Sequence, residues 1–215
     1  MFVRDRMTTS VTAVSAKTSF PDALKLMQEG GFRRLPVVDR KGRLVGIVSE
    51  RDLLHAAPSA ASSLSIWEVQ YLLSKLEIEM IMTKDVVTVT PEMPVEDAAS
   101  LMVIKKVGGL PVVDKEKRVI GIITETDIFE TFVEMFSAGA AGLRLTLRVP
   151  ERKGVLAKLA TTIFELGGSI ESVGSFYGEV AGERDLVIKV RDVSKDQLVD
   201  TLEALGDQVV DARDA

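Results

Sequence analysis

The sequence contains no cysteine and only one histidine, His55. The first absence excludes disulfides, thiolate metal ligands and cysteine nucleophiles. A metal site built from several histidines is excluded, and a Ser–His catalytic pair would have to use His55. This residue lies in "LLHAAPSA", where we expect a helix to end and its side chain to face solvent. Much conventional catalytic chemistry is therefore disfavoured.

Long apolar runs and basic blocks are also missing. No run approaches the roughly 20 residues that a membrane-spanning helix needs, and the N-terminal "MFVRDRMTTSV" lacks the apolar core of a secretory signal. The 215 residues include 27 Lys and Arg against 32 Asp and Glu, a net charge of −5, which does not favour nucleic-acid binding. We expect a cytoplasmic protein with neither a nucleic-acid partner nor a membrane partner.

What the sequence does contain is an internal repeat. "RRLPVVDRKGRLVGIVSERDLL", from Arg33, aligns without a gap with "GGLPVVDKEKRVIGIITETDIF", from Gly108, at a constant offset of 75 positions. The same offset aligns Met7-Thr8 with Met82-Thr83. We define the first repeat as residues 7–54 and the second as residues 82–129.

Each repeat has the pattern of a βαββα unit. Short β-branched segments (10–14 and 85–90) are typical of strands, and "SFPDALKLMQEGG" (19–31) has helical spacing with a glycine stop. "LPVVD" and "RLVGIVS", joined by a charged turn, predict a β-hairpin. Between the repeats, Ser65 and Glu68 predict a capping box that starts a linker helix.

The pattern changes after the small-residue joint "SAGAAG" (137–142). Strands are predicted over 143–149, 169–177, 183–191 and 207–213, with amphipathic helices over 153–168 and 194–206. This βαββαβ order is the ferredoxin-like, split-βαβ arrangement. The predicted fold class is therefore mixed α+β or α/β, with two βαββα repeats followed by a βαββαβ domain.

The two repeats resemble a tandem pair of CBS domains, a Bateman module, over residues 7–137. The resemblance implies two clefts that take an adenosine-containing regulatory ligand (AMP, ADP, ATP, S-adenosylmethionine or NAD), with no required cofactor. We expect CBS domain 1 over 1–60, a linker helix over 61–81, CBS domain 2 over 82–137, a linker over 138–142 and a further domain over 143–215.

The motifs Ser49-x-x-Asp52 and Thr124-x-x-Asp127 have two interpretations. Each is a hydroxyl N-cap with an acid at the third helical position, which is sufficient to start a helix. The same groups suit a nucleotide, since a carboxylate accepts both hydroxyls of a ribose. The resemblance implies that Asp52 and Asp127 bind ribose, with Ser49 and Thr124 beside ribose or phosphate.

The segments before each "LP" differ between the repeats. By resemblance, residues 32–34 and 107–109 border the ligand, and Thr12 and Val87 lie near its base. Arg33 and Arg34 suit phosphate oxygens, or are a solvated pair at a strand start, whereas Gly108 and Gly109 supply no charge. We therefore expect the two clefts to differ in affinity or in the phosphate length that they accept. The expected nucleotide-binding residues are Thr12, Phe32, Arg33, Arg34, Ser49, Asp52, Val87, Val107, Thr124 and Asp127.

The last domain resembles an ACT domain through "VPERKGVLAKLA" and "ELGGSIESV". That resemblance implies amino-acid binding at Glu151, Gly154 and Val155, commonly at a dimer interface. The family's loop often has an acidic-x-Pro-Gly sequence, whereas here it has Arg152 and Lys153 between Glu151 and Gly154, so a packing or dimerisation role stays open. A CBS pair with one ACT domain resembles the AcuB family of acetoin utilisation proteins.

We therefore expect a non-catalytic regulatory protein that senses small-molecule ligands, forms a homodimer and acts on an unidentified protein partner, controlling acetoin or related carbon metabolism. The alternatives are a metabolic enzyme or regulatory subunit linked to IMP dehydrogenase-like chemistry, or a structural dimerisation module without ligand. A DNA-binding regulator lacks a basic recognition helix.

Overall fold

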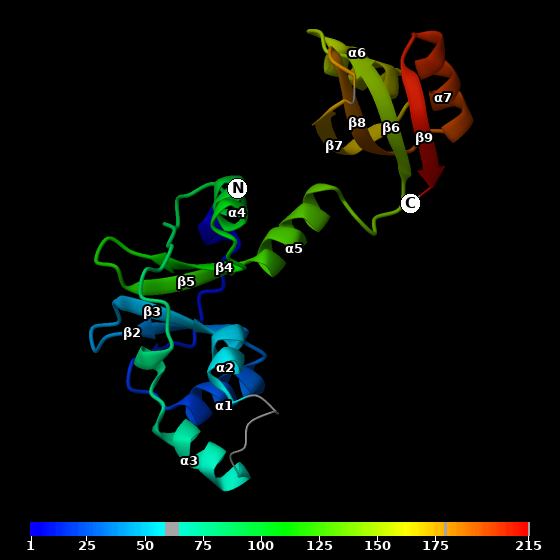
Figure 1. Ribbon diagram of the computed structural model, residues 1–215. Helices are drawn as coiled ribbons and strands as arrows, with labels where there is room; N and C mark the ends of the chain where they lie inside the picture. Colours follow the sequence, from blue (N-terminus) through cyan, green and yellow to red (C-terminus); the bar gives the residue numbers. More distant parts are fainter. Residues whose placement is uncertain (59–64, 179, 215) are drawn as a thin grey trace. The chain divides into compact units, whose positions relative to one another are not determined.

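The computed structural model describes residues 1–58, 65–178 and 180–214. The chain divides into two compact units, Met1–Ile128 and Phe129–Ala215 (Figure 1). The expected border between the first domain and the linker, at residues 60 and 61, lies outside the described residues. None of the helices in the described ranges has the length and apolar character needed to span a membrane.

The first repeat forms β1 (Val14–Ser15), α1 (Phe20–Gly30), β2 (Arg34–Val38), β3 (Leu44–Ser49) and α2 (Glu50–Ala56). The Ser19 side chain caps α1 by accepting a hydrogen bond from the Asp22 amide, and Gly31 ends the helix in the left-handed region at φ 64°. His55 lies exposed in the last turn of α2, as expected from the sequence. The helix and hairpin predicted for this repeat are confirmed.

The linker helix α3 (Ile66–Lys75) starts at the predicted capping box, where the Ser65 hydroxyl lies 2.7 Å from Oε2 of Glu68. The second repeat then forms α4 (Val95–Lys105), β4 (Gly109–Val113), β5 (Val119–Thr124) and α5 (Glu125–Met135). β4 and β5 pair in the same register as β2 and β3, displaced by the 75-residue offset.

The strands predicted over 85–90 and 10–14 are wrong in extent. The predicted strand over 85–90 is reduced to one bridge between Val89 and Val112. In it, the Val89 amide donates to the Pro111 carbonyl (3.1 Å) and the Val113 amide donates to the Val89 carbonyl (3.0 Å). The next rung toward Val87 would need an amide hydrogen on Pro111, which proline lacks. Pro36 ends the pairing of β1 in the same way, so only Val14 and Ser15 are strand.

The first unit has two hydrophobic cores, one for each repeat, and each core includes a residue from outside that repeat. Val3, in a short 3₁₀ turn η1 (Val3–Asp5), is fully buried among second-repeat residues such as Leu110 and Ile123. Ile78, 75 positions later in η2 (Ile78–Met80), is fully buried among first-repeat residues such as Leu35. Each core is therefore completed by a segment that precedes the other repeat in sequence.

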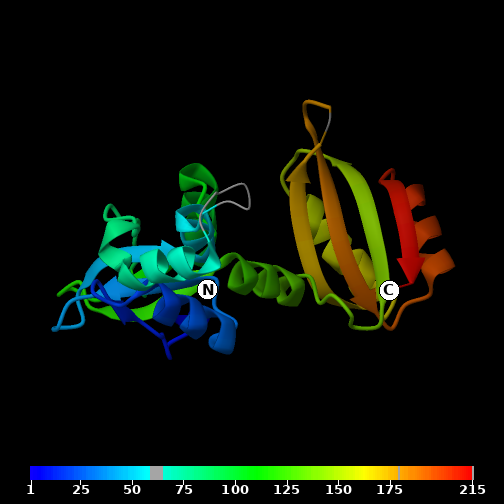
Figure 2. The ribbon, with the colours of Figure 1, turned by 60° about the horizontal axis from the view of Figure 1, so that its bottom comes forward.

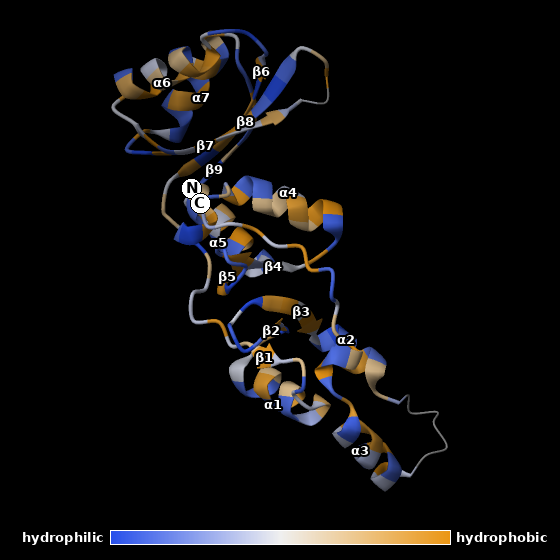
Figure 3. Ribbon diagram, turned by 90° about the vertical axis from the view of Figure 1, so that its left-hand side faces the viewer, coloured by the Kyte–Doolittle hydropathy of each residue, from blue (hydrophilic) through white to orange (hydrophobic). Residues whose placement is uncertain are grey.

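Two equivalent backbone rungs join the repeats. The amide and carbonyl of Thr8 exchange hydrogen bonds with Ile122 (2.9 and 3.0 Å), and those of Thr83 exchange them with Ile47 (2.9 and 3.0 Å). The hairpins β2–β3 and β4–β5 consequently lie against each other, with the helices outside them (Figure 3). The repeats therefore form one module with approximate twofold symmetry.

The second unit contains β6 (Leu143–Pro150), α6 (Val155–Glu165), β7 (Ser169–Tyr177), β8 (Glu183–Arg191), α7 (Lys195–Ala204) and β9 (Gln208–Asp214). Its antiparallel sheet has the order β7-β8-β6-β9. α6 and α7 cover one face (Figure 2), where Leu145, Leu147, Ile163 and Leu198 are fully or almost fully buried. The predicted βαββαβ element order is confirmed.

Candidate functional site

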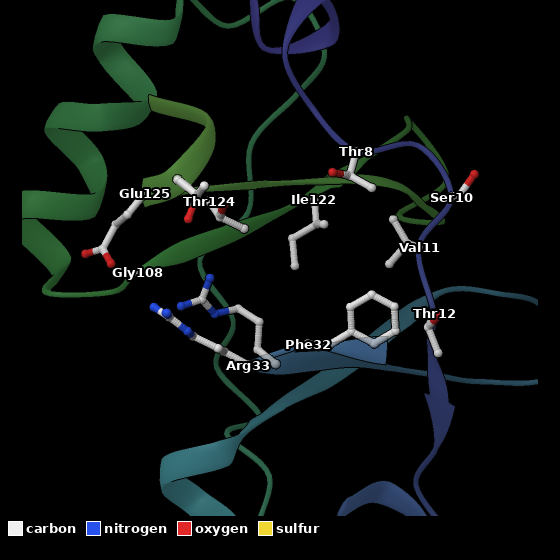
Figure 4. A pocket seen from close by; sticks show the side chains of 13 residues that line it. Thr8, Ser10, Val11, Thr12, Phe32, Arg33, Gly108, Ile122, Thr124 and Glu125 are labelled. Atoms are coloured by element: carbon white, nitrogen blue, oxygen red, sulfur yellow. The ribbon is translucent and has the colours of Figure 1, made fainter. Parts of the chain in front are cut away.

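Two cavities open between the repeats in the first unit. We call the one of about 280 Å³ the first cleft (Figure 4) and the one of about 410 Å³ the second cleft. The first cleft is lined by Thr8, Ser10, Val11, Thr12, Gly31, Phe32, Arg33, Arg34, Gly108, Ile122, Thr124, Glu125 and Thr126. The second is lined by Arg33, Arg34, Ile47, Ser49, Glu50, Arg51, Asp52, Thr83, Asp85, Val86, Val87, Lys106, Val107, Gly108 and Gly109.

The clefts are related by the repeat offset, and each draws on both repeats. Thr12 and Phe32 of the first repeat meet Thr124 of the second in the first cleft. Val87 and Val107 of the second repeat meet the Ser49-x-x-Asp52 motif of the first in the second cleft. In each cleft, the helix-start motif of one repeat therefore lies together with the residues that precede the "LP" strand of the other repeat.

The residues expected at the ligand divide between the clefts. The first cleft contains Thr12, Phe32, Arg33, Arg34 and Thr124. The second contains Arg33, Arg34, Ser49, Asp52, Val87 and Val107. Asp127 is not among the residues that line either cavity.

The capping interpretation of both motifs is confirmed by their hydrogen bonds. Oδ2 of Asp52 accepts from the Ser49 amide (2.8 Å) and hydroxyl (2.7 Å), and the Asp52 amide donates back to Oγ of Ser49 (3.3 Å). Oδ2 of Asp127 accepts from the Thr124 amide and hydroxyl, both at 2.7 Å. These bonds fix the orientation of each carboxylate, and Asp52 additionally lines the second cleft.

The arginine pair contributes to both clefts. Arg33 and Arg34 line both cavities, because the second repeat has glycine at the equivalent positions. A Cβ built on Gly109 would lie 2.9 Å from Cζ of Arg34, so the guanidinium occupies the space of the missing side chain. The second cleft therefore receives the guanidinium groups of the first repeat, at positions where the second repeat has Gly108 and Gly109.

Arg34 is half-buried, and its electrostatic surroundings are mixed. Burial is the main cause that lowers the pKa of its guanidinium; Glu125 raises it, Arg33 lowers it and Asp127 raises it. The two acids lie in the first turn of α5 and compensate the charge that burial disfavours. Arg34 is consequently a partly desolvated cation positioned beside acids.

The first cleft has an apolar end and a charged end. Figure 4 shows Val11, Phe32 and Ile122 around one part of the cavity and Arg33 and Glu125 around the other. An apolar slot suits a planar base, and guanidinium groups suit phosphate or carboxylate oxygens. In the second cleft, Ile47, Val86 and Val87 supply the apolar surface, and Arg51 and Lys106 supply further cations.

Several lining residues were not expected from the sequence. Thr8 and Thr83, Ile47 and Ile122, and Glu50 and Glu125 are pairs at the 75-residue offset that line opposite clefts. The offset indicates that the members of each pair are equivalent. That they face a cavity is visible only in the structure, where each cleft is formed by residues of both repeats. In the described ranges, no group of three or more His, Asp and Glu side chains is placed to hold a metal ion.

A third cavity, of about 590 Å³, lies in the second unit. It is lined by Glu151 and Gly154 in the loop after β6, by Val155 at the start of α6, and by Ser175 and Arg184 from the sheet. Oε1 of Glu151 accepts from Nε of Arg184 and lies 3.0 Å from its Nη2. This hydrogen bonding raises the pKa of Arg184. The loop acid is thus already paired with a cation at the cavity wall.

Comparison with known proteins connects these clefts to a family. The family model described as "CBS domain" matches residues 3–59 and 77–134. A CBS domain-containing protein of Dictyostelium discoideum is 34% identical over 135 residues, which are 63% of this chain and 93% of that protein. A homoserine O-acetyltransferase of Methanohalobium evestigatum is 36% identical over 127 residues, but these cover only 23% of its length.

Three solved structures share the fold of the first unit. A CBS domain pair in complex with 5′-methylthioadenosine and S-adenosyl-L-methionine is 31% identical, with a TM-score of 0.52, over 61% of this chain and 95% of that one. CBSX2 in complex with AMP is 34% identical, with a TM-score of 0.51, over 61% and 96%. A Vibrio cholerae structure named as an acetoin utilization protein (AcuB) is 31% identical, with a TM-score of 0.54, over 64% and 93%.

Proposed function

Because this chain belongs to the family of CBS-domain proteins, we propose that it is a regulatory protein that binds an adenosine nucleotide in the clefts of its first unit. The observation that carries the proposal is the arrangement of the first cleft, which combines an apolar slot beside Phe32 and Ile122 with the guanidinium groups of Arg33 and Arg34. Solved relatives that match 61% of this chain are in complex with AMP, or with S-adenosyl-L-methionine and 5′-methylthioadenosine.

In the proposed complex, the base lies against the apolar slot and the phosphate lies at the charged end. In the second cleft Asp52 accepts the ribose hydroxyls, and its Oδ2 is held in place by Ser49. We assign the corresponding position in the first cleft to Asp127, supported by its equivalent bonds to Thr124. Thr12 and Val87 border the base, and Val107 replaces Phe32 in the second cleft.

The ligand acts by preferring one conformation of the module over another. An enzyme reading has less support, because the chain spans only 23% of a relative that carries an enzyme name and aligns with it over 127 residues. We propose that the signal is passed to a protein partner and that the functional form is a homodimer. The similarity to the AcuB structure supports a role in acetoin or related carbon metabolism.

We propose further that the second unit is an ACT-like module that binds an amino acid at the cavity beside Glu151, Gly154 and Val155. The βαββαβ order and the cavity at the loop after β6 support this assignment. Arg152 and Lys153, together with the Glu151–Arg184 pair, favour a ligand that carries a carboxylate. A purely structural, dimerising unit is the alternative.

Thermal melting of the full chain in the presence of ligands tests these assignments. A ligand at 100 times its dissociation constant should stabilise the folded state by about 2.7 kcal/mol. We expect a rise in melting temperature with AMP, ADP, ATP, NAD or S-adenosylmethionine, and separately with amino acids for the second unit. No rise with any of the five adenosine ligands at millimolar concentration would reject nucleotide sensing and leave the dimerisation module.

A further inference from the structure

The two clefts share one set of arginines. Positions 33 and 34 in the first repeat correspond to positions 108 and 109 in the second, so a symmetric module would place its own pair of side chains in each cleft. Here the second repeat has only glycine, and Arg33 and Arg34 line both cavities. The approximate symmetry of the clefts is therefore broken at the position best suited to bind an anion.

The glycines create the space that Arg34 occupies. Gly109 is buried at the start of β4, and a Cβ on it would lie 2.9 Å from Cζ of Arg34. A Cβ on Gly108 would lie 2.7 Å from Nη2 of Arg34 and 2.7 Å from Oε2 of Glu125. The guanidinium thus reaches from its own repeat to the backbone of the other, and the Glu125 carboxylate lies close to the same point of Gly108.

A guanidinium binds a phosphate best through two parallel hydrogen bonds from one edge of its plane. A single guanidinium cannot orient that edge toward two clefts at the same time. Arg34 is half-buried and lies close to the Glu125 carboxylate beside Gly108, so turning it toward a second anion removes it from the first. A ligand without a phosphate makes no such demand.

We propose that Arg34 is a shared anion-recognition residue, so that a phosphate-bearing ligand bound in one cleft weakens the binding of a second such ligand in the other. This inference rests on the proposed function, namely adenosine-nucleotide binding in the clefts. It adds that charged ligands bind with negative coupling whereas uncharged ones bind independently. The module then responds over a wider concentration range of nucleotide than two independent sites would give.

Titration calorimetry with AMP and adenosine measures this coupling. Thr12→Phe fills the first cleft and Val87→Phe fills the second, and the two positions are equivalent by the repeat offset. For AMP, we compare the dissociation constant of the weaker cleft in the unmodified protein with that of the same cleft when phenylalanine fills the other. We expect the value in the unmodified protein to be about tenfold higher. For adenosine, the two values should agree within about twofold.

Arg34→Met, introduced into the parent and both filled variants, should abolish the difference for AMP, whereas Lys106→Met, at a cation that lines only the second cleft, should preserve it. If the filled variants do not fold, the ratio of the two AMP dissociation constants in the parent replaces them, and Arg34→Met should reduce it to the adenosine ratio.

If AMP binds each cleft independently of the other, and adenosine also binds, only the shared role of Arg34 is overturned. No heat with AMP or adenosine in the parent, together with no rise in melting temperature for AMP, ADP, ATP, NAD or S-adenosylmethionine, overturns the proposed function, and the coupling with it.

Discussion

The guanidinium of Arg34 occupies the space into which a side chain at position 109 would project. The two residues lie 75 positions apart and are equivalent in the repeat, so one supplies a side chain and the other supplies room for it. A large cation on one repeat and glycine on the other are therefore complementary. This relationship places the guanidinium of Arg34 in the second cleft, although the second repeat has glycine at the equivalent position.

Gly109→Ala should displace Arg34 and reduce the preference for AMP over adenosine in both clefts. The stability cost should be small, because the displaced atoms are the end of a flexible side chain and Gly109 does not have a positive φ. Calorimetry with both ligands measures the preference. In an Arg34→Met background, Gly109→Ala should have no further effect on that preference, because both changes remove the same contact; an additive loss would contradict this account.

Asp52→Asn should weaken nucleotide binding in the second cleft by about tenfold or more, since it removes a charged acceptor of ribose hydroxyls. The melting temperature without ligand should stay close to that of the parent, because asparagine keeps an oxygen that can accept from Ser49. Glu68→Gln is the matched control: it removes the charge from a capping box of the same geometry that lines neither cleft. Equal nucleotide affinity in both variants would reduce "GIVSERD" to a helix start.

Ile78→Ala should lower the free energy of unfolding by about 2–5 kcal/mol, because a large side chain is removed from a filled core. Ile78 is 0% exposed, although it lies in the segment between the repeats. Met80→Ala, two positions later at a side chain that is 69% exposed, should change the stability by less than about 0.5 kcal/mol. Urea unfolding of the two variants tests whether this segment completes the core of the first repeat.

Stability should fall in acid partly through the two hairpin turns. The pKa of Asp39 is lowered by the backbone and side-chain hydrogen bonds of Arg43. At Asp114, burial favours a higher pKa, but bonds from Arg118 outweigh it and the pKa is again lowered. A depressed pKa stabilises the fold above the ordinary aspartate value of 3.8, and the contribution is lost as the pH falls through the lower folded value.

The double variant Asp39→Asn, Asp114→Asn should therefore lose less stability than the parent between about pH 5 and pH 3. Urea unfolding at several pH values within that range measures the two slopes. Parallel slopes would show that these turns make no pH-dependent contribution.

The fragment 129–215 should fold alone, because its sheet and both helices enclose a core made only of its own residues, such as Leu145, Ile163 and Leu198. Circular dichroism should give a mixed helix and strand spectrum with a cooperative thermal transition. A random-coil spectrum at several protein concentrations would contradict this prediction.

The sequence alone determined the repeats, most of the elements and the capping boxes, because these depend on local periodicity and on residues three or four positions apart. Ser65 with Glu68, Gly31 after α1 and the hairpin turns are examples. Pro36 and Pro111 were visible in the sequence, but their effect on the first strands required knowing which rung each proline occupies. Only the tertiary structure decided that Val3 is buried in the core of the second repeat and Ile78 in the core of the first. It also decided that Arg34 reaches the glycines of the other repeat. These contacts join residues that are far apart in the sequence, such as Val3 and Ile123 or Ile78 and Leu35. No local pattern specifies which partner lies across a symmetry axis.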